Sequence, residues 1–147
     1  MDRFIIQGGY PLEGEVIPSG NKNAALPLLA ACVLTDEPII LRNVPQIKDV
    51  LNMRALLESL GLEFEDLSGH TWRINARDIR PADLDPDLCR KIRASILLAG
   101  PMLARAGGMT LPPPGGDVIG RRRVDTHILA FEGLGAEAEY DLVDRVF

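Results

Sequence analysis

The chain has 147 residues, of which 46% are hydrophobic and 25% charged, and its formal net charge is −5. These values are typical of one soluble globular domain that buries a real core, and the acidic balance excludes a general nucleic-acid or anionic-membrane binder, which needs a basic face. Its two cysteines, Cys32 and Cys89, show no metal-binding spacing, so they favour a reducing cytoplasm over a disulfide framework or a zinc site.

Short extended runs alternate with helical runs from the start of the chain. The longest apolar run, residues 24–34, is too short to cross a bilayer and instead belongs to a buried helix. The hydrophobic periodicity predicts strands at 3–7 and 14–18, a helix over 21–34, a strand at 38–43, a helix over 47–61 that ends at Gly61, and strands at 62–66 and 71–76.

The second half of the chain continues the alternation after a polar loop at 77–87. A long helix is expected to follow, with Asp85 as its N-cap, Pro86 at its first position and glycines at its end. The body of this long helix covers residues 88–108. It is followed by a strand at 109–112, a loop at 113–123, a helix over 124–135 and a strand at 136–140.

This order repeats within the chain. The run "LPLLAACVLTDEPIIL" aligns with "SILLAGPMLARAGGMTL" at an offset of 69–70 residues, and "RALLESLGLEFE" aligns with "HILAFEGLGAEAE" at an offset of 74. A repeated helix–strand–helix–strand unit is a supersecondary building block. The change of offset places an insertion in the loop at 113–123, which indicates that this loop does more than connect two elements.

Lys22 and Asn23 stand where a strand gives way to a helix, in "SGNKNAAL". A helix N-terminus favours anions, so a lysine there is locally unfavourable unless an anion binds to both the ammonium and the helix end. Asn23 offers hydrogen bonds to a polar ligand. The alternative is that Ser19 or Asn21 caps the helix while the Lys22 side chain extends into water.

Cations also gather in the second half of the chain. On the predicted long helix, Arg90 and Arg93 are three residues apart and share a face, which fits either an anion site or a solvated basic patch. The stretch "PGGDVIGRRRVD" then puts Asp117 in a glycine turn before three consecutive arginines. Arginine forks match phosphate and carboxylate oxygens.

Two acids border this arginine run, and each admits two interpretations. Asp117 is either an Asx-turn residue or an acid placed beside a bound anion. Asp125 is expected to cap the following helix, in competition with a contact to a ligand.

Taken together, the strings "GEVIPSGNKNAALPLLAA", "NVPQIKDV", "KIRASILLAGPMLAR" and "LPPPGGDVIGRRRVDTHI" resemble the opening part of the UDP-N-acetylglucosamine enolpyruvyltransferase family. The resemblance runs along essentially the whole chain. It covers well under half of a family member, because those enzymes continue through a second domain.

The resemblance implies an α+β fold of repeated βαβαββ units, an inside-out α/β barrel of which this chain would hold about two repeats. It implies that residues 1–20 are strands that pack with the second domain, absent here, and that residues 21–147 form the first two repeats. Because the second wall of the cleft is missing, the chain alone is expected to be inactive.

The resemblance also implies a reaction. The enolpyruvyl group of phosphoenolpyruvate moves to the 3′-hydroxyl of UDP-N-acetylglucosamine by addition and elimination, phosphate leaves, and the product enters cytoplasmic peptidoglycan precursor synthesis. No metal or cofactor is implied, and the expected partners are these two small molecules and the rest of the enzyme.

Residue roles carried over from the family follow the matching positions. Lys22 matches the lysine that contacts phosphoenolpyruvate, and Asn23 matches an asparagine that binds the sugar. Asp117 falls where most members carry a reactive cysteine and would act as the general acid. The remaining matches are anion-pocket arginines at Arg93 and Arg122, and a uridine-side segment of Arg122, Arg123, Val124, Asp125 and Thr126, in which Arg123 replaces a usual proline.

Two rival functions remain at this point. One is the sister enzyme that acts on shikimate 3-phosphate; its pattern has lysine–serine followed by arginine at the first helix, whereas here Lys22 is followed by asparagine without that arginine. The other is a non-catalytic fragment that binds a nucleotide sugar.

Overall fold

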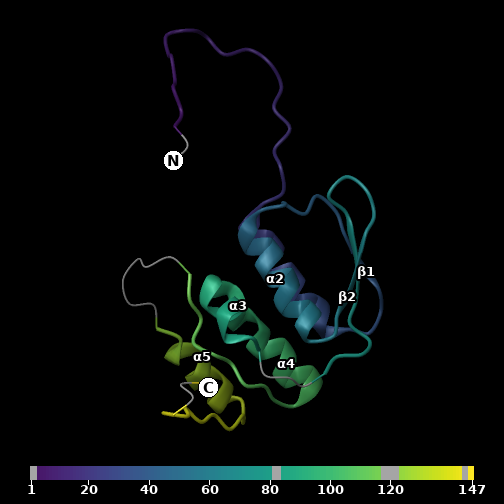
Figure 1. Cartoon of the computed structure of the whole chain (residues 1–147), viewed down its shortest axis with the longest axis vertical. Coiled ribbons are helices and arrows are strands. Elements are labelled where there is room, and N and C mark those ends of the chain that lie inside the picture. Colours follow the sequence, from purple (N-terminus) through teal and green to yellow (C-terminus); the bar gives the residue numbers. More distant parts are fainter. Residues whose placement is uncertain (1–2, 81–83, 117–122, 144–145) are drawn as a thin grey trace.

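The structure is a computed structural model, and it describes residues 3–80, 84–116, 123–143 and 146–147. Helices and a small antiparallel sheet make an α+β arrangement (Figure 1). Its elements are α1 (Lys22–Ala31), a 3-10 turn η1 (Cys32–Leu34), β1 (Ile39–Leu41), α2 (Lys48–Ser59), β2 (Glu63–Asp66), β3 (Trp72–Asn75), α3 (Pro86–Lys91), a 3-10 segment η2 (Arg93–Leu98), α4 (Ala99–Ala106) and α5 (Asp125–Gly133).

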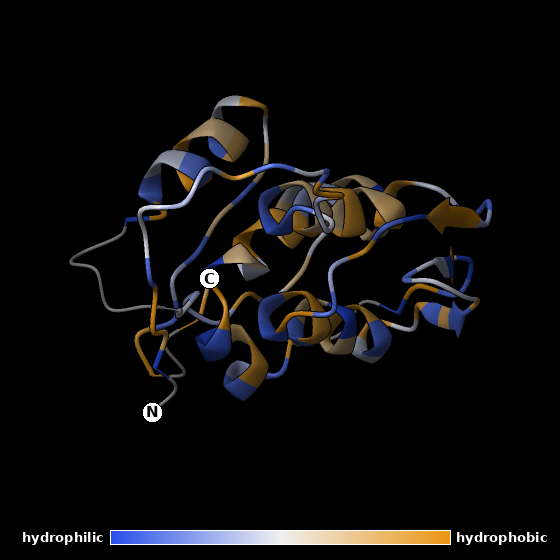
Figure 2. Cartoon of the chain, turned by 90° about the horizontal axis from the view of Figure 1, so that it is seen from above, coloured by the Kyte–Doolittle hydropathy of each residue, from blue (hydrophilic) through white to orange (hydrophobic). Residues whose placement is uncertain are grey.

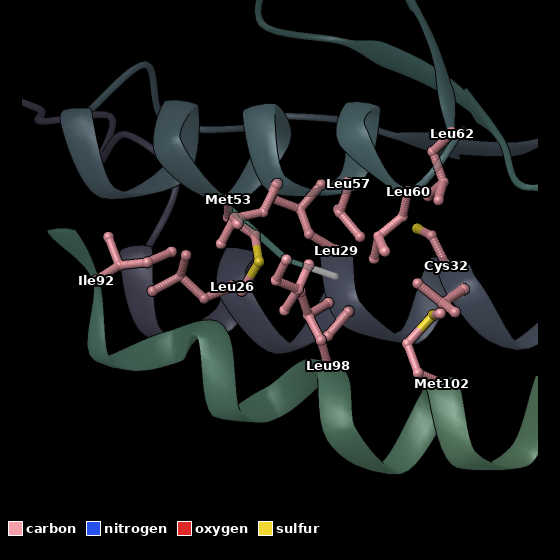
Figure 3. Packing of buried hydrophobic residues seen from close by; sticks show 14 of the residues in the cluster. Leu26, Leu29, Cys32, Met53, Leu57, Leu60, Leu62, Ile92, Leu98 and Met102 are labelled. Atoms are coloured by element: carbon pink, nitrogen blue, oxygen red, sulfur yellow. The ribbon is translucent and has the colours of Figure 1, made fainter. Parts of the chain in front are cut away.

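The core lies between α1, α2 and the η2–α4 segment. Leu29 of α1 and Met53 of α2 are fully buried, and they face Leu98 and Met102 from the opposite side (Figure 3). Figure 2 shows both hydrophobic and hydrophilic residues on the helices. In α1, α2 and α4 the buried residues recur at helical spacing, which is the pattern of a helix that buries one stripe.

The sheet has the order β1-β3-β2, with both pairs antiparallel. Ile74 of β3 lies between Ile39 of β1 and Phe64 of β2. Trp72 and Ile74 are buried on one face while Arg73 between them is exposed, which is the period-two alternation of a sheet covered on one side.

Most of the first repeat forms as predicted. Asp85 caps α3 with Pro86 at its first position, and Gly61 follows α2 with a φ of 97°. In the second repeat, Leu111 and Phe147 exchange backbone hydrogen bonds of 2.7 and 3.0 Å, which is the pattern of an antiparallel pair.

Four predicted strands are not regular strands. Residues 3–7, 14–18, 109–112 and 136–140 have no ladder in the structure. A strand needs a neighbour for its backbone groups, and the described part of the chain supplies none for residues 3–18. Phe4, Ile6 and Leu12 are therefore 88–99% exposed, and the N-terminal segment stands apart from the helices (Figure 1).

No helix in the described ranges is long and apolar enough to span a membrane. The apolar run at 24–34 forms the rest of α1 and the turn η1, and it is helical as predicted, with Leu29 and Val33 fully buried.

Candidate active site

Lys22 and Asn23 are the first two residues of α1, and the preceding residue explains why the helix starts there. The side-chain oxygen of Asn21 accepts a hydrogen bond from the Ala24 backbone at 3.1 Å, so Asn21 is one of the two predicted N-caps. The first turn of α1 has no acidic residue. Lys22 pairs instead with α2, where its Nζ lies 2.9 Å from Oδ2 of Asp49.

The predicted long helix at 88–108 is wrong, and its break builds part of the site. Ile92 has extended backbone, with φ −135° and ψ 135°, between α3 and η2. A continuous α-helix would use the carbonyls of Cys89 and Arg90. Here they accept hydrogen bonds of 3.0 Å from the backbone N–H groups of Gly115 and Gly116.

The glycine loop is therefore docked on the broken helix. A Cβ at position 115 would lie 1.8 Å from the Arg90 carbonyl oxygen, so only glycine fits there. The break also separates the two arginines that were expected to share a face. Arg90 pairs with Asp87 at 2.5 Å and is mostly exposed, whereas Arg93 lies beside Gly116.

One cavity of about 440 Å³ brings together three predicted site residues. Lys22 and Asn23 enter it from α1, and Arg93 enters it from η2. The rest of its lining comes from α1, α2 and the segment around the helix break: Leu26, Pro27, Asp49, Lys91, Ile92, Ala94, Ile96, Leu97 and Gly116. Two lysines and one arginine around a single space can bind an anion.

A second cavity of about 620 Å³ shares Arg93 with the first and includes Arg123, Val124 and Asp125. Nη2 of Arg93 donates a hydrogen bond to the Arg123 carbonyl oxygen at 2.7 Å. Arg93 thus connects the Lys22 side of the site with the segment before α5.

Asp125 does not cap α5, contrary to prediction. It is the first residue of that helix, and Val124 occupies the N-cap position without a side-chain capping bond. The guanidinium of Arg123 donates hydrogen bonds to both carboxylate oxygens of Asp125, from Nε to Oδ1 at 2.9 Å and from Nη2 to Oδ2. This hydrogen bonding lowers the pKa of the Asp125 carboxyl below its usual value.

The remaining predicted site residues lie elsewhere. Thr126 is exposed in the first turn of α5 and lines neither cavity. Asp117 and Arg122 lie outside the described residues. A third cavity, of about 490 Å³, is lined mainly by apolar residues of α4, α5 and the C-terminal segment and holds none of the predicted site residues.

Sequence reasoning missed Asp49 and Lys91, which line the first cavity. Asp49 lies inside the quoted string "NVPQIKDV", but its partner Lys22 is 27 residues away, and no local spacing links them. Lys91 ends α3, where it becomes part of the site only because the helix stops.

Both cysteines are buried and should be inert in the folded chain. Burial raises the pKa of the Cys32 and Cys89 thiols to about 11. Because the thiolate is the reactive form, iodoacetamide at pH 8 is expected to leave both unmodified in the folded chain and to alkylate both in denaturant. Mass spectrometry of intact chains measures this, and alkylation without denaturant would contradict the prediction.

Comparison with known proteins places these features in context. The sequence model of the family described as EPSP synthase (3-phosphoshikimate 1-carboxyvinyltransferase) matches residues 6–144. The chain is 57% identical over 135 residues to the UDP-N-acetylglucosamine 1-carboxyvinyltransferase of Bradyrhizobium diazoefficiens, and 52% identical over 141 residues to the protein of that name from Treponema denticola.

These matches cover 92% and 96% of this chain but 31% and 33% of the two relatives, so the chain spans about a third of their length. Among solved structures, the crystal structure of the enolpyruvyl transferase NikO from Streptomyces tendae is similar, with a TM-score of 0.66 and 25% sequence identity. That match covers 86% of this chain and 27% of the other.

Proposed function

We propose that this chain, which belongs to the EPSP synthase (3-phosphoshikimate 1-carboxyvinyltransferase) family, supplies part of the active site of an enolpyruvyl transferase. The donor in this proposal is phosphoenolpyruvate and the acceptor is the 3′-hydroxyl of UDP-N-acetylglucosamine. The identity of 57% to a UDP-N-acetylglucosamine 1-carboxyvinyltransferase is the observation that carries the choice of acceptor. The product enters peptidoglycan precursor synthesis.

The proposed reaction has two steps. In the addition, the C=C bond of phosphoenolpyruvate opens as a general acid gives a proton to the methylene carbon, and the acceptor hydroxyl loses its own proton to a base or to solvent as its oxygen bonds to C2, giving a tetrahedral ketal. In the elimination, the bond from C2 to the phosphate oxygen breaks, the new methyl group loses a proton, and the double bond re-forms with release of phosphate.

The cationic cavity supports the donor half of this proposal. Lys22 and Arg93 would bind the phosphate and carboxylate of phosphoenolpyruvate, and Arg122 would join them. Fixed cations stabilise negative charge that develops in the transition state without reorganising. Asp117 would donate the proton. It directly follows Gly116, which lines the same cavity.

The acceptor half of the proposal uses the neighbouring residues. Asn23, in the same cavity, would hydrogen-bond the sugar. Arg123, Val124, Asp125 and Thr126 would lie along the uridine, and Arg93 supports this by its hydrogen bond to the Arg123 carbonyl. A second domain would close the cleft, and the exposed apolar residues of segment 3–19 would pack with it.

A longer protein tests this function. This chain can be joined to the remaining two-thirds of the Bradyrhizobium diazoefficiens relative, and phosphate release measured with UDP-N-acetylglucosamine or with shikimate 3-phosphate. We expect release with the nucleotide sugar, and none from the 147-residue chain alone, because the positioning and charge stabilisation that the rest of the longer protein would supply are missing. Release with shikimate 3-phosphate only would favour the acceptor that the family description names.

Fosfomycin provides a second prediction. This epoxide inhibitor acts on UDP-N-acetylglucosamine enolpyruvyltransferases by alkylating the loop cysteine that most of them carry, whereas a carboxylate is a much weaker nucleophile toward an epoxide. The joined protein with Asp117 should therefore keep its activity in fosfomycin, and Asp117→Cys should become covalently inhibited while remaining active. Mass spectrometry identifies the modified residue, and an inhibitor adduct on Asp117 itself would contradict the prediction.

A further inference from the structure

Asp49 is the one acid among the described residues that line the 440 Å³ cavity, which otherwise presents Lys22, Lys91 and Arg93 as its charged groups. Its carboxylate lies 2.9 Å from the Lys22 ammonium. An acid inside a cationic cavity opposes anion binding by its charge alone. Its placement therefore requires another reason.

The fold brings Asp49 and Lys22 together from two helix starts. Lys22 begins α1, and Asp49 lies in the first turn of α2, which packs against α1. A carboxylate is favourable at the N-terminus of α2, whereas an ammonium is unfavourable at that of α1. Asp49 therefore offsets the repulsion between the Lys22 ammonium and the N-terminus of α1, whose own first turn contains no acidic residue.

This ion pair is partly open to water, because the Lys22 and Asp49 side chains are 45% and 39% exposed. Ion pairs of such exposure contribute little to stability. What the pair does fix is the place of the ammonium, since a lysine side chain otherwise samples many rotamers.

We propose that Asp49 is a positioning residue for Lys22, holding the ammonium at the cavity so that it can bind the anionic donor. An ammonium carries three N–H donors, so bonding to one Asp49 oxygen does not exhaust its capacity to bind an anion. The proposal deepens the proposed function and rests on it, because it assigns Asp49 to the lysine that contacts phosphoenolpyruvate.

The chain is well suited to a direct test, because its three lysines are Lys22, Lys48 and Lys91. Trace acetylation with an activated acetate ester, read by mass spectrometry for each lysine, compares their reactivity in the folded 147-residue chain. The variant is Asp49→Asn. The matched control is Asp87→Asn, which removes the same charge from an exposed pair with Arg90 that lies outside the cavity.

Without phosphoenolpyruvate, Lys22 should be acetylated about threefold faster in Asp49→Asn than in the wild-type chain, the expected scale for losing an exposed ion pair. Lys91 should stay within about twofold in every variant. Asp87→Asn should leave Lys22 unchanged, and Asp49→Glu, which keeps a carboxylate, should recover the slow labelling. Thermal melting of each variant verifies that the chain remains folded.

With phosphoenolpyruvate, the sign of the effect separates positioning from charge. Removing a negative charge should tighten anion binding if charge alone matters. This comparison uses the joined protein, which carries the complete cleft. If Asp49 positions the ammonium, the concentration of phosphoenolpyruvate that half-protects Lys22 should instead rise about threefold to tenfold in Asp49→Asn, the scale of one hydrogen bond.

Two results overturn the role of Asp49. One is equal Lys22 labelling in the wild type and Asp49→Asn, and the other is half-protection at an unchanged or lower concentration of phosphoenolpyruvate in the variant. A different result concerns the proposed function: if phosphoenolpyruvate does not protect Lys22 in the joined protein with wild-type Asp49 while Asp49→Asn still labels faster, the coupling stands and the donor assignment falls.

Discussion

Replacing Asp117 by asparagine in the joined protein should lower enolpyruvyl transfer by about 10²–10⁴-fold, the usual contribution of a positioned acid. Asparagine keeps the shape and size of the side chain but has no acidic proton to give to the methylene carbon. Rates should be measured at saturating substrates, so that a change in binding does not mask the change in chemistry.

The pH dependence gives a second reading of the same variant. If the proton of Asp117 is needed, the wild-type rate falls as pH rises through the pKa of the acid in the closed complex, and the Asp117→Asn rate loses that limb. Asp87→Asn is the control, because Asp87 is 77% exposed and lines neither of the two cavities that share Arg93. A near-normal rate for Asp117→Asn would show that the acid is only a turn residue.

The start of α1 shows what local sequence predicts well. An asparagine before an apolar helical run predicts an N-cap, and the capping bond to Ala24 forms. The same stretch of sequence places Lys22 at a helix N-terminus, where negative charge is favoured, and this unfavourable position identifies Lys22 as a candidate site residue. Both conclusions need only neighbouring residues, and the structure places Lys22, Asn23 and Arg93 around one cavity.

The break at Ile92 shows where local reasoning stops. Residues 88–108 have a helical apolar pattern throughout, and nothing near Ile92 in the sequence ends a helix. The break depends on Gly115 and Gly116, which lie more than 20 residues away. Their backbone N–H groups donate hydrogen bonds to the carbonyls of Cys89 and Arg90. Such competition between tertiary and helical hydrogen bonds cannot be read from periodicity.

The N-terminal segment fails for a related reason. Its aromatic and β-branched residues predict strands at 3–7 and 14–18, but a strand forms only where a partner strand pairs with its backbone groups. In the described ranges that partner is missing, so Ile5 and Val16 are 84% and 88% exposed. The apolar pattern therefore indicates which residues favour a strand, but it does not identify the strand with which they pair.

Replacing Lys22 by alanine in the joined protein should remove most phosphoenolpyruvate-dependent turnover, a loss of about 10²–10³-fold, similar to deleting one group that stabilises transition-state charge. The fold should hardly change, because Lys22 is exposed and its pair with Asp49 is a surface pair. We expect the free energy of unfolding to fall by no more than about 0.5 kcal/mol.

Comparing turnover with melting temperature distinguishes an electrostatic Lys22 from a structural one. Arg77→Ala is the matched control, since it removes one exposed positive charge from a residue that lines neither of the two cavities that share Arg93. Retained turnover in Lys22→Ala would contradict the donor assignment. A cation that only binds substrate can be removed without loosening the packing of α1 against α2. A melting temperature lowered by much more than about 2 °C would therefore show that Lys22 instead supports the fold.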